Sequence, residues 1–158
     1  MKNEILPSTE LLTCNEVEIH YKRPVFSSMK KITSSKDAIA LMRKFHQTSF
    51  DVKEHFWLIC LSSANHALNI STIGVGCTQS SPVDIKAILQ TALLSHATAI
   101  IAVHNHPSGN LIFSHSDIQV TNKIIKACEL FSLVLLDHII ITSESYCSMA
   151  DSRISPFT

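Results

Sequence analysis

The sequence has no surplus of either charge, since its 13 basic and 13 acidic residues give a formal net charge of zero. Proteins that bind nucleic acid through its phosphates usually carry a basic surplus or a basic stripe. The balance therefore argues against direct nucleic-acid binding. A local basic group does occur near the N-terminus, and we interpret it as part of a solvated tail; it consists of Lys22, Arg23, Lys30 and Lys31.

The sequence also lacks any paired-cysteine motif. Its five cysteines, at positions 14, 60, 77, 128 and 147, form no C-x-x-C pair, and their number is odd. Two of them, Cys60 and Cys128, fall in a predicted strand and a predicted helix, where cysteine behaves as a small hydrophobic residue. This usage fits a reducing compartment better than a disulfide scaffold.

Long uninterrupted apolar runs are missing as well. Residues 1–14 contain charged side chains and no apolar core of a secretory signal. The most apolar long segment, residues 88–103, is too short for a membrane span. It is also interrupted by four polar side chains: Gln90, Thr91, Ser95 and His96. We therefore expect a cytoplasmic protein that does not enter a membrane.

What the sequence does contain is enough apolar material for one globular domain. Its 158 residues are 46% hydrophobic and 16% charged, which is typical of a folded chain with a real core. Residues 1–31 show no clear periodicity apart from a short alternating stretch at 17–21 that fits an edge strand. We expect an N-terminal arm over residues 1–31 and a single domain over residues 32–158.

The apolar spacing within that domain predicts interleaved helices and strands. Helices are expected from 34–37 to 46–49, from 82–84 onward, and over 117–130. Strands are expected over 56–61, 67–73, 99–104, 133–142 and 146–149. This order predicts an α/β or α+β fold, a mixed sheet with helices packed on it. The G-x-G at 74–76 has no dinucleotide fingerprint around it and is interpreted as a loop or bulge.

The stretch from His104 to Asp117, HNHPSGNLIFSHSD, carries the chemistry. His104 and His106 stand two residues apart at a strand end, so both can face one metal ion. Ser114 fits the N-cap of the next helix, which places Asp117 in its first turn. Two histidines and one carboxylate, with a fourth position left to water, form the ligand set of a catalytic zinc site. An isolated H-x-H pair is common without metal, so the prediction rests on the whole string.

This string resembles the signature of the JAB/MPN (JAMM) metalloprotease superfamily, H-x-H-P followed at fixed spacing by S-x-x-D. The variant H-N-H-P-S-G-N at 104–110 and the segment L-D-H-I-I-I at 136–141 resemble the bacterial RadC branch in particular. The resemblance covers roughly residues 32–152. It implies one JAB/MPN-like, cytidine-deaminase-like domain, a mixed β-sheet with flanking helices.

The resemblance also implies a glutamate upstream of the histidines, at the start of an early strand. Glu54 opens the apolar segment EHFWLICL and fits this role. Asp51 and Glu10 are the other upstream acids, but neither directly opens a strand. On the alternative interpretation, Glu54 is only a solvated acid at a strand edge.

By this resemblance the chain is a zinc metallohydrolase that cleaves an amide or isopeptide bond in a peptide substrate. Zn²⁺ held by His104, His106 and Asp117 would lower the pKa of a water from about 15.7 toward about 7. Glu54 would accept its proton and pass it to the leaving amine. Ser114 would donate a hydrogen bond to the developing oxyanion or serve only as a helix cap, and the sequence leaves both roles open. His138, inside an apolar strand, is expected to be a buried, hydrogen-bonded residue rather than a ligand.

Two other interpretations belong to different functional classes. In the first, the domain keeps its fold and metal but only binds a protein partner. In the second, it is an accessory of DNA repair or recombination, the traditional description of the RadC branch, which the neutral charge does not favour. The letters H-N-H at 104–106 do not indicate an HNH nuclease, whose histidines lie far apart along the chain. The oligomeric state stays open between a monomer and a homodimer.

Overall fold

The computed structural model describes residues 29–46, 50–76 and 83–157. Its elements follow the order α1 (Ser35–Phe45), β1 (Glu54–Leu61), β2 (Ala67–Gly76), α2 (Ile85–Leu94), β3 (Ala99–Asn105), α3 (His115–Glu129), β4 (Val134–Ile141) and β5 (Tyr146–Ser148). The predicted α+β fold is confirmed. The predicted arm over residues 1–31, with its edge strand at 17–21, lies outside the described residues except for positions 29–31.

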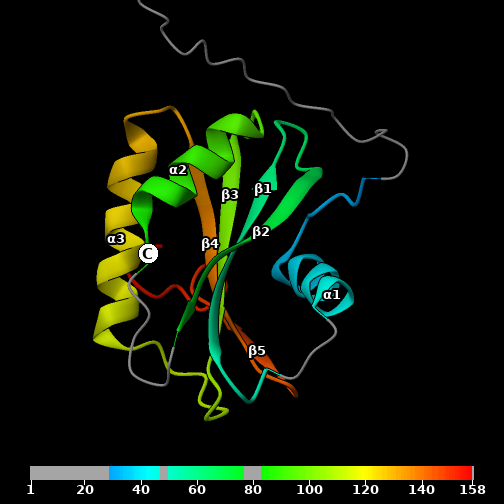
Figure 1. Cartoon of the computed structure of the whole chain (residues 1–158), viewed down its shortest axis with the longest axis vertical. Helices are drawn as coiled ribbons and strands as arrows, with labels where there is room; N and C mark the ends of the chain where they lie inside the picture. Colours follow the sequence, from blue (N-terminus) through cyan, green and yellow to red (C-terminus); the bar gives the residue numbers. More distant parts are fainter. Residues whose placement is uncertain (1–28, 47–49, 77–82, 158) are drawn as a thin grey trace, which may run out of the picture.

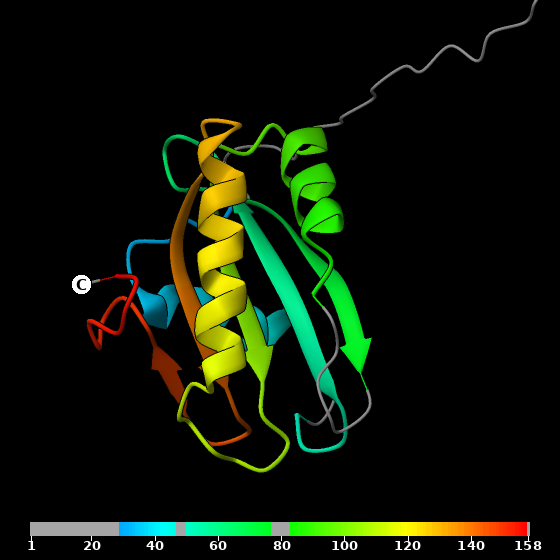
Figure 2. The same ribbon diagram turned by 90° about the vertical axis from the view of Figure 1, so that its left-hand side faces the viewer.

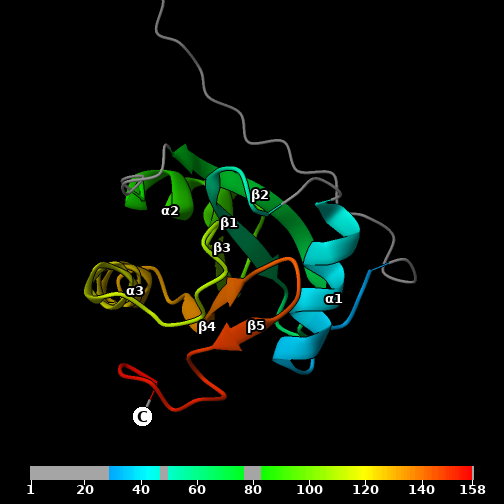
Figure 3. The same cartoon turned by 90° about the horizontal axis from the view of Figure 1, so that it is seen from below.

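The five strands form one mixed sheet in the order β2-β1-β3-β4-β5. Neighbouring strands are antiparallel except β3 and β4, which run parallel and are connected by α3. Figure 1 shows α1 on one face of the sheet and both α2 and α3 on the other. The same three layers are visible from below in Figure 3. β3 and β4 are parallel because α3 carries the chain back from the end of β3 to the end of the sheet where β3 began, so β4 runs in the same direction.

Alternation along the central strands explains the two apolar cores. Trp57 and Ile59 of β1 pack with Ile39 of α1 on one face of the sheet. Leu58 of β1 packs on the other face with α2 and α3, through Ile88 among others. β1 and β3 are therefore apolar at nearly every position, as strands covered on both sides must be. Figure 2 looks onto the face where α3 and α2 lie side by side over the strands.

The second strand extends three residues beyond its predicted end at residue 73. The stretch Gly74–Gly76, predicted to be a loop or bulge, continues β2, since Gly74 pairs with Phe56 and Gly76 with Glu54. The irregularity lies just before it, where the β1–β2 register shifts between Phe56 and Trp57. Small residues can continue a strand whenever a neighbouring backbone supplies the ladder hydrogen bonds, which local sequence does not reveal.

None of the helices that the structure describes has the length and apolar content that a membrane span requires.

Candidate metal centre

The candidate site lies where β3 ends and α3 begins. His104 is the penultimate residue of β3, and His106 is the first residue after it. A turn follows directly, closed by a hydrogen bond from the Gly109 N–H to the His106 carbonyl at 2.9 Å. Gly109 has φ +76°, a left-handed conformation that glycine adopts without strain. The turn reverses the chain, so the loop that follows can bring the start of α3 back beside the histidines.

The start of α3 places the carboxylate. Ser114 is the N-cap, and its hydroxyl accepts a hydrogen bond from the Asp117 N–H at 3.2 Å. In return, Asp117 Oδ2 accepts from the Ser114 N–H at 2.7 Å and from its hydroxyl at 2.6 Å. This capping box fixes the carboxylate against the helix end. Oδ2 is thereby engaged, while Oδ1 points toward His104.

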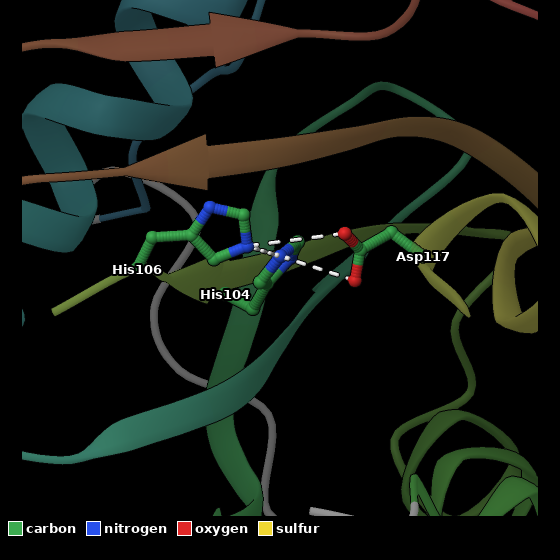
Figure 4. Close-up of side chains that lie close together, drawn as sticks. All are labelled: His104, His106 and Asp117. Atoms are coloured by element: carbon green, nitrogen blue, oxygen red, sulfur yellow. Dashed lines mark hydrogen bonds and ion pairs between the residues drawn. The ribbon is translucent and has the colours of Figure 1, made fainter. Parts of the chain in front are cut away.

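The three side chains converge as predicted, and their ligand atoms all lie within 4.8 Å of one another. Figure 4 shows both imidazole rings facing the Asp117 carboxylate. The two Nε2 atoms of the histidines are 2.9 Å apart. His104 Nε2 lies 3.4 Å from Asp117 Oδ1, and His106 Nε2 lies 3.8 Å from Oδ2. Tetrahedral ligands about 2.0–2.1 Å from a zinc ion stand about 3.4 Å from each other, so this spacing suits one ion.

The protonation of the rings also suits a metal. His106 Nδ1 faces the Asn110 carbonyl at 2.7 Å and must carry the proton, because a carbonyl only accepts. Its Nε2, turned into the cluster, is therefore free to coordinate. Burial lowers the pKa of His104 to about 4, although the Asp117 carboxylate opposes this shift. The His104 ring is consequently neutral at pH 7, the state in which imidazole binds metal ions.

Glu54 faces the same space. It is the first residue of β1 and is partly buried. A cavity of about 320 Å³ is lined by Glu54 together with His104 and Asp117. A second cavity is lined by Glu54 with His106 and Ser114. Burial raises the pKa of Glu54; the Asp117 charge adds to the rise, and His106 opposes it. A carboxyl with a raised pKa next to a metal site can both accept and return a proton.

The alternative acids are not placed in this way. Asp51 accepts hydrogen bonds from the Ser143 hydroxyl at 2.7 and 2.8 Å. It lines a different depression, together with Ser143 and Glu144. Glu10 lies outside the described residues. Among the described acids upstream of the histidines, Glu54 is the one that lines a cavity with the ligand cluster.

Among the described histidines beside the candidate ligands, His55 and His115 have contacts away from the cluster, whereas His138 contacts His104. His55 stacks on Trp57, on one face of the sheet. Phe56 packs on the opposite face, and Glu54 lines a cavity with it, as alternation along the strand predicts. His115 contacts Gln119 Nε2 at 3.0 Å on the exposed side of α3. His138 is fully buried, and its Nε2 lies 2.8 Å from His104 Nδ1. The prediction that His138 is a buried, hydrogen-bonded residue agrees with this geometry.

Sequence reasoning missed the role of Asn105. This side chain is fully buried and points away from the two flanking histidines. Its amide nitrogen donates to the carbonyls of Phe50 and Lys53, at 2.6 and 2.7 Å, and its oxygen accepts from the His55 N–H at 2.6 Å. Asn105 therefore fastens the segment that carries Glu54 to the strand that carries the histidines. Asn105 is the last residue of β3 and follows the predicted strand end at His104, so the local sequence carried no signal of these contacts.

Comparison with known proteins agrees with the geometry. The family model of the RadC-like JAB domain matches residues 32–154. The chain is 36% identical to a UPF0758 protein of Coprothermobacter proteolyticus over 126 residues, which are 78% of this chain and 54% of that protein. It is 33% identical to a UPF0758 protein of Clostridium acetobutylicum over 147 residues, 93% of this chain and 63% of the relative. A UPF0758 protein of Streptococcus gordonii is 39% identical over 119 residues, 75% of this chain and 52% of the relative. The chain thus spans about half the length of most of these relatives.

Proposed function

The chain belongs to the family of RadC-like JAB domains, and from this premise we propose that it is a zinc-dependent hydrolase that cleaves an amide or isopeptide bond. The observation that carries the proposal is the convergence of two imidazole nitrogens and one carboxylate beside a partly buried glutamate. The substrate we propose is a peptide or an isopeptide-linked protein. The three cysteines that the structure describes are free thiols, which suits an enzyme of the cytoplasm.

The donor set favours zinc among the common ions. Two neutral imidazoles and one carboxylate match catalytic zinc sites, which keep one position for water or substrate. Calcium and magnesium prefer sites built from oxygen ligands alone. His104 and His106 would bind through Nε2 and Asp117 through Oδ1. When bound, zinc would supply Lewis acidity toward the substrate carbonyl and would lower the pKa of a water.

Glu54 has the place and the chemistry of the proton carrier. It lines the cavity beside His104 and Asp117 and also the cavity beside His106. A water or a substrate amide in either cavity therefore comes within reach of the Glu54 carboxylate. Its carboxylate accepts a proton in the attack step and returns it to the leaving amine. Its position also favours an enzyme over a scaffold that only binds a partner, because a scaffold has no use for a base in this cavity.

Ser114 borders the cavity on the side of His106. We propose that its hydroxyl, which serves as helix cap, also donates a hydrogen bond to the oxyanion. Removing one such donor typically lowers the rate by about 10²–10³. As helix cap, the hydroxyl oxygen accepts from the Asp117 N–H, while its proton is donated to Asp117 Oδ2. An oxyanion would take that proton in place of Oδ2.

Two substitutions test the proposal together, with a third as control. His106→Ala should abolish stoichiometric zinc, measured by elemental analysis of protein purified without chelators. Glu54→Gln should retain zinc and reduce hydrolysis of a peptide and isopeptide library by about 10²–10⁴. The control is His115→Ala, because His115 is an exposed histidine two residues from Asp117 whose contact is Gln119. Unchanged zinc in His106→Ala, or unchanged turnover in Glu54→Gln, would contradict the assignment.

A further inference from the structure

We propose that Thr121 and His138 are positioning residues that set the tautomer of His104 and connect it to the backbone of Asp117. Four groups form a continuous hydrogen-bonded chain: the Asp117 carbonyl, the Thr121 hydroxyl, the His138 ring and the His104 ring. The inference rests on the proposed metal centre, since its consequence is a correctly oriented ligand. It concerns residues that do not themselves touch the ion or the substrate.

The direction of the chain follows from its first member. The Thr121 hydroxyl lies 2.5 Å from the Asp117 carbonyl oxygen, which can only accept. A hydroxyl has one proton, so Thr121 donates it to this carbonyl. Thr121 Oγ1 also lies 2.6 Å from His138 Nδ1. With its proton already committed, the oxygen must accept here, and His138 must carry a proton on Nδ1.

The same reasoning passes through His138 to the ligand. A neutral imidazole with its proton on Nδ1 has a lone pair on Nε2. His138 Nε2 lies 2.8 Å from His104 Nδ1, so His104 donates from Nδ1. His104 is then left with a lone pair on Nε2, which is the nitrogen that faces His106 and Asp117. The hydroxyl of Thr121 thus determines, through one ring, which nitrogen of His104 is available to a metal.

The surroundings leave the chain little freedom to choose another arrangement. The Thr121 and His138 side chains are fully buried, and His104 is 1% exposed. The rings of Phe56 and Phe113 pack against both His104 and His138. These apolar rings offer no competing hydrogen-bond partner, so a flipped imidazole would leave buried polar atoms unpaired, at a cost of about 1–3 kcal/mol each.

The chain also connects three elements. His104 lies on β3, His138 on β4, and Thr121 on α3 one turn after Asp117. A threonine that bonds to the carbonyl four residues earlier is ordinary in helices. The additional bond to His138 connects the helix that carries Asp117, through the His138 ring, to His104, which would hold the metal. Partners of this kind typically change metal affinity by 10–100-fold when removed.

The test compares two substitutions at one buried position. Thr121→Val keeps the side-chain volume and removes the hydroxyl, while Thr121→Ser keeps the hydroxyl. We expect Thr121→Val to bind Zn²⁺ about 10–100-fold more weakly in competition with a chromophoric chelator. Thr121→Ser should stay close to the unsubstituted protein. Thr142→Val removes another buried hydroxyl, one that donates to the Ser145 carbonyl, and should leave zinc affinity unchanged.

A second measurement separates this inference from the proposed function. Imidazole ¹⁵N shifts of the metal-free protein report tautomers directly, and we expect Nδ1–H for both His104 and His138. In Thr121→Val, the His138 signals should shift toward a mixture of tautomers. Equal zinc affinity of the Val and Ser variants, or an Nε2–H tautomer at either histidine, would overturn the inference. If the protein bound no zinc, the proposed function would fail while the tautomers would still decide this question.

Discussion

At the scale of single residues, Asn105 shows how one side chain can join two parts of a site. Both flanking histidines face the cluster, while Asn105 faces the opposite side of β3 and uses its amide for three hydrogen bonds. Two of them are donated to carbonyls, so an acceptor cannot replace this amide. Asn105 thereby ties the segment that carries Glu54 to candidate ligands that lie fifty residues later in the chain.

Asn105→Asp should therefore destabilise the protein strongly. The substitution keeps the shape but removes both donors, leaves the carbonyls of Phe50 and Lys53 unpaired, and places a carboxylate beside them. We expect the free energy of unfolding, measured by chemical denaturation, to fall by about 2–4 kcal/mol. Asn110→Asp is the matched control, because the exposed Asn110 uses its side-chain oxygen to accept from the Ile112 N–H, which aspartate can also do. Equal stability of the two variants would contradict this account.

At the scale of elements, the chain contains two helix starts with the same S-x-x-D pattern. Ser34 and Asp37 begin α1, and Ser114 and Asp117 begin α3. At α1 the carboxylate accepts from Thr33 and pairs with Lys30 at 3.4 Å, and the Thr33 hydrogen bonds hold the pKa of Asp37 below its usual range. At α3 the carboxylate meets two histidines instead. In both helices the serine hydroxyl accepts from the aspartate N–H, but the reciprocal backbone bond of a capping box forms only at α3. Only Asp117 also faces two histidines, which makes it the candidate ligand.

Ser114→Gly separates the two functions proposed for this hydroxyl. Glycine at an N-cap costs only a few tenths of a kcal/mol relative to serine. The substitution also removes the hydroxyl bond to Asp117 Oδ2, but the Ser114 backbone N–H, which donates to the same oxygen, remains in place. We expect zinc content and unfolding free energy to change little, and turnover on a cleavable peptide to fall by about 10²–10³. Ser34→Gly, at the cap of α1, should change stability similarly and leave turnover intact. Full turnover in Ser114→Gly would restrict Ser114 to capping.

At the scale of the whole molecule, the candidate site needs two layers of the fold: the sheet carries His104 and His138, and the helix α3 packed on it carries Asp117. The sheet, α3 and the loop after β3 enclose His104 and His138 so completely that burial lowers the pKa of both rings, that of His138 well below its usual value. In the unfolded chain these rings would accept protons near pH 6.5. The folded protein therefore binds these protons less readily than the unfolded chain does, so acid lowers the free energy of unfolding.

Metal-free protein should consequently lose stability between pH 7.5 and pH 5.5. Over this range the unfolded chain binds protons at His104 and His138 that the folded chain does not, so unfolding becomes easier as pH falls. The expected loss is about 2–3 kcal/mol for the two rings together, read from urea midpoints at each pH. Burial raises the pKa of Glu54 and Asp137, which acts with the opposite sign. Stability that is constant or rises toward pH 5.5 would contradict the prediction.

The sequence predicted most of the fold because its apolar spacing is regular. The runs that became β1 and β3 are apolar at nearly every position, and the helix starts carry Asp84 and Ser114 as caps. The end of β2 was not predicted, because Gly74 and Gly76 are held in the strand by pairing with β1 and not by any preference of their own. The three candidate ligands could be found because they lie within fourteen residues and follow strand and helix geometry. Their assignment as ligands stays a prediction.

Local sequence was enough to predict which residues alternate, where helices begin, and that two histidines and one aspartate can reach a common point. What surrounds that point depends on the packing of distant segments. Glu54 comes from β1, His138 from β4, and Thr121 from the buried side of α3. Local spacing is fixed by bond geometry over a few residues, whereas contacts between distant segments depend on how the sheet and helices pack. The proton position that we infer for His104 follows from those distant contacts, whereas that of His106 follows from the nearby Asn110 carbonyl.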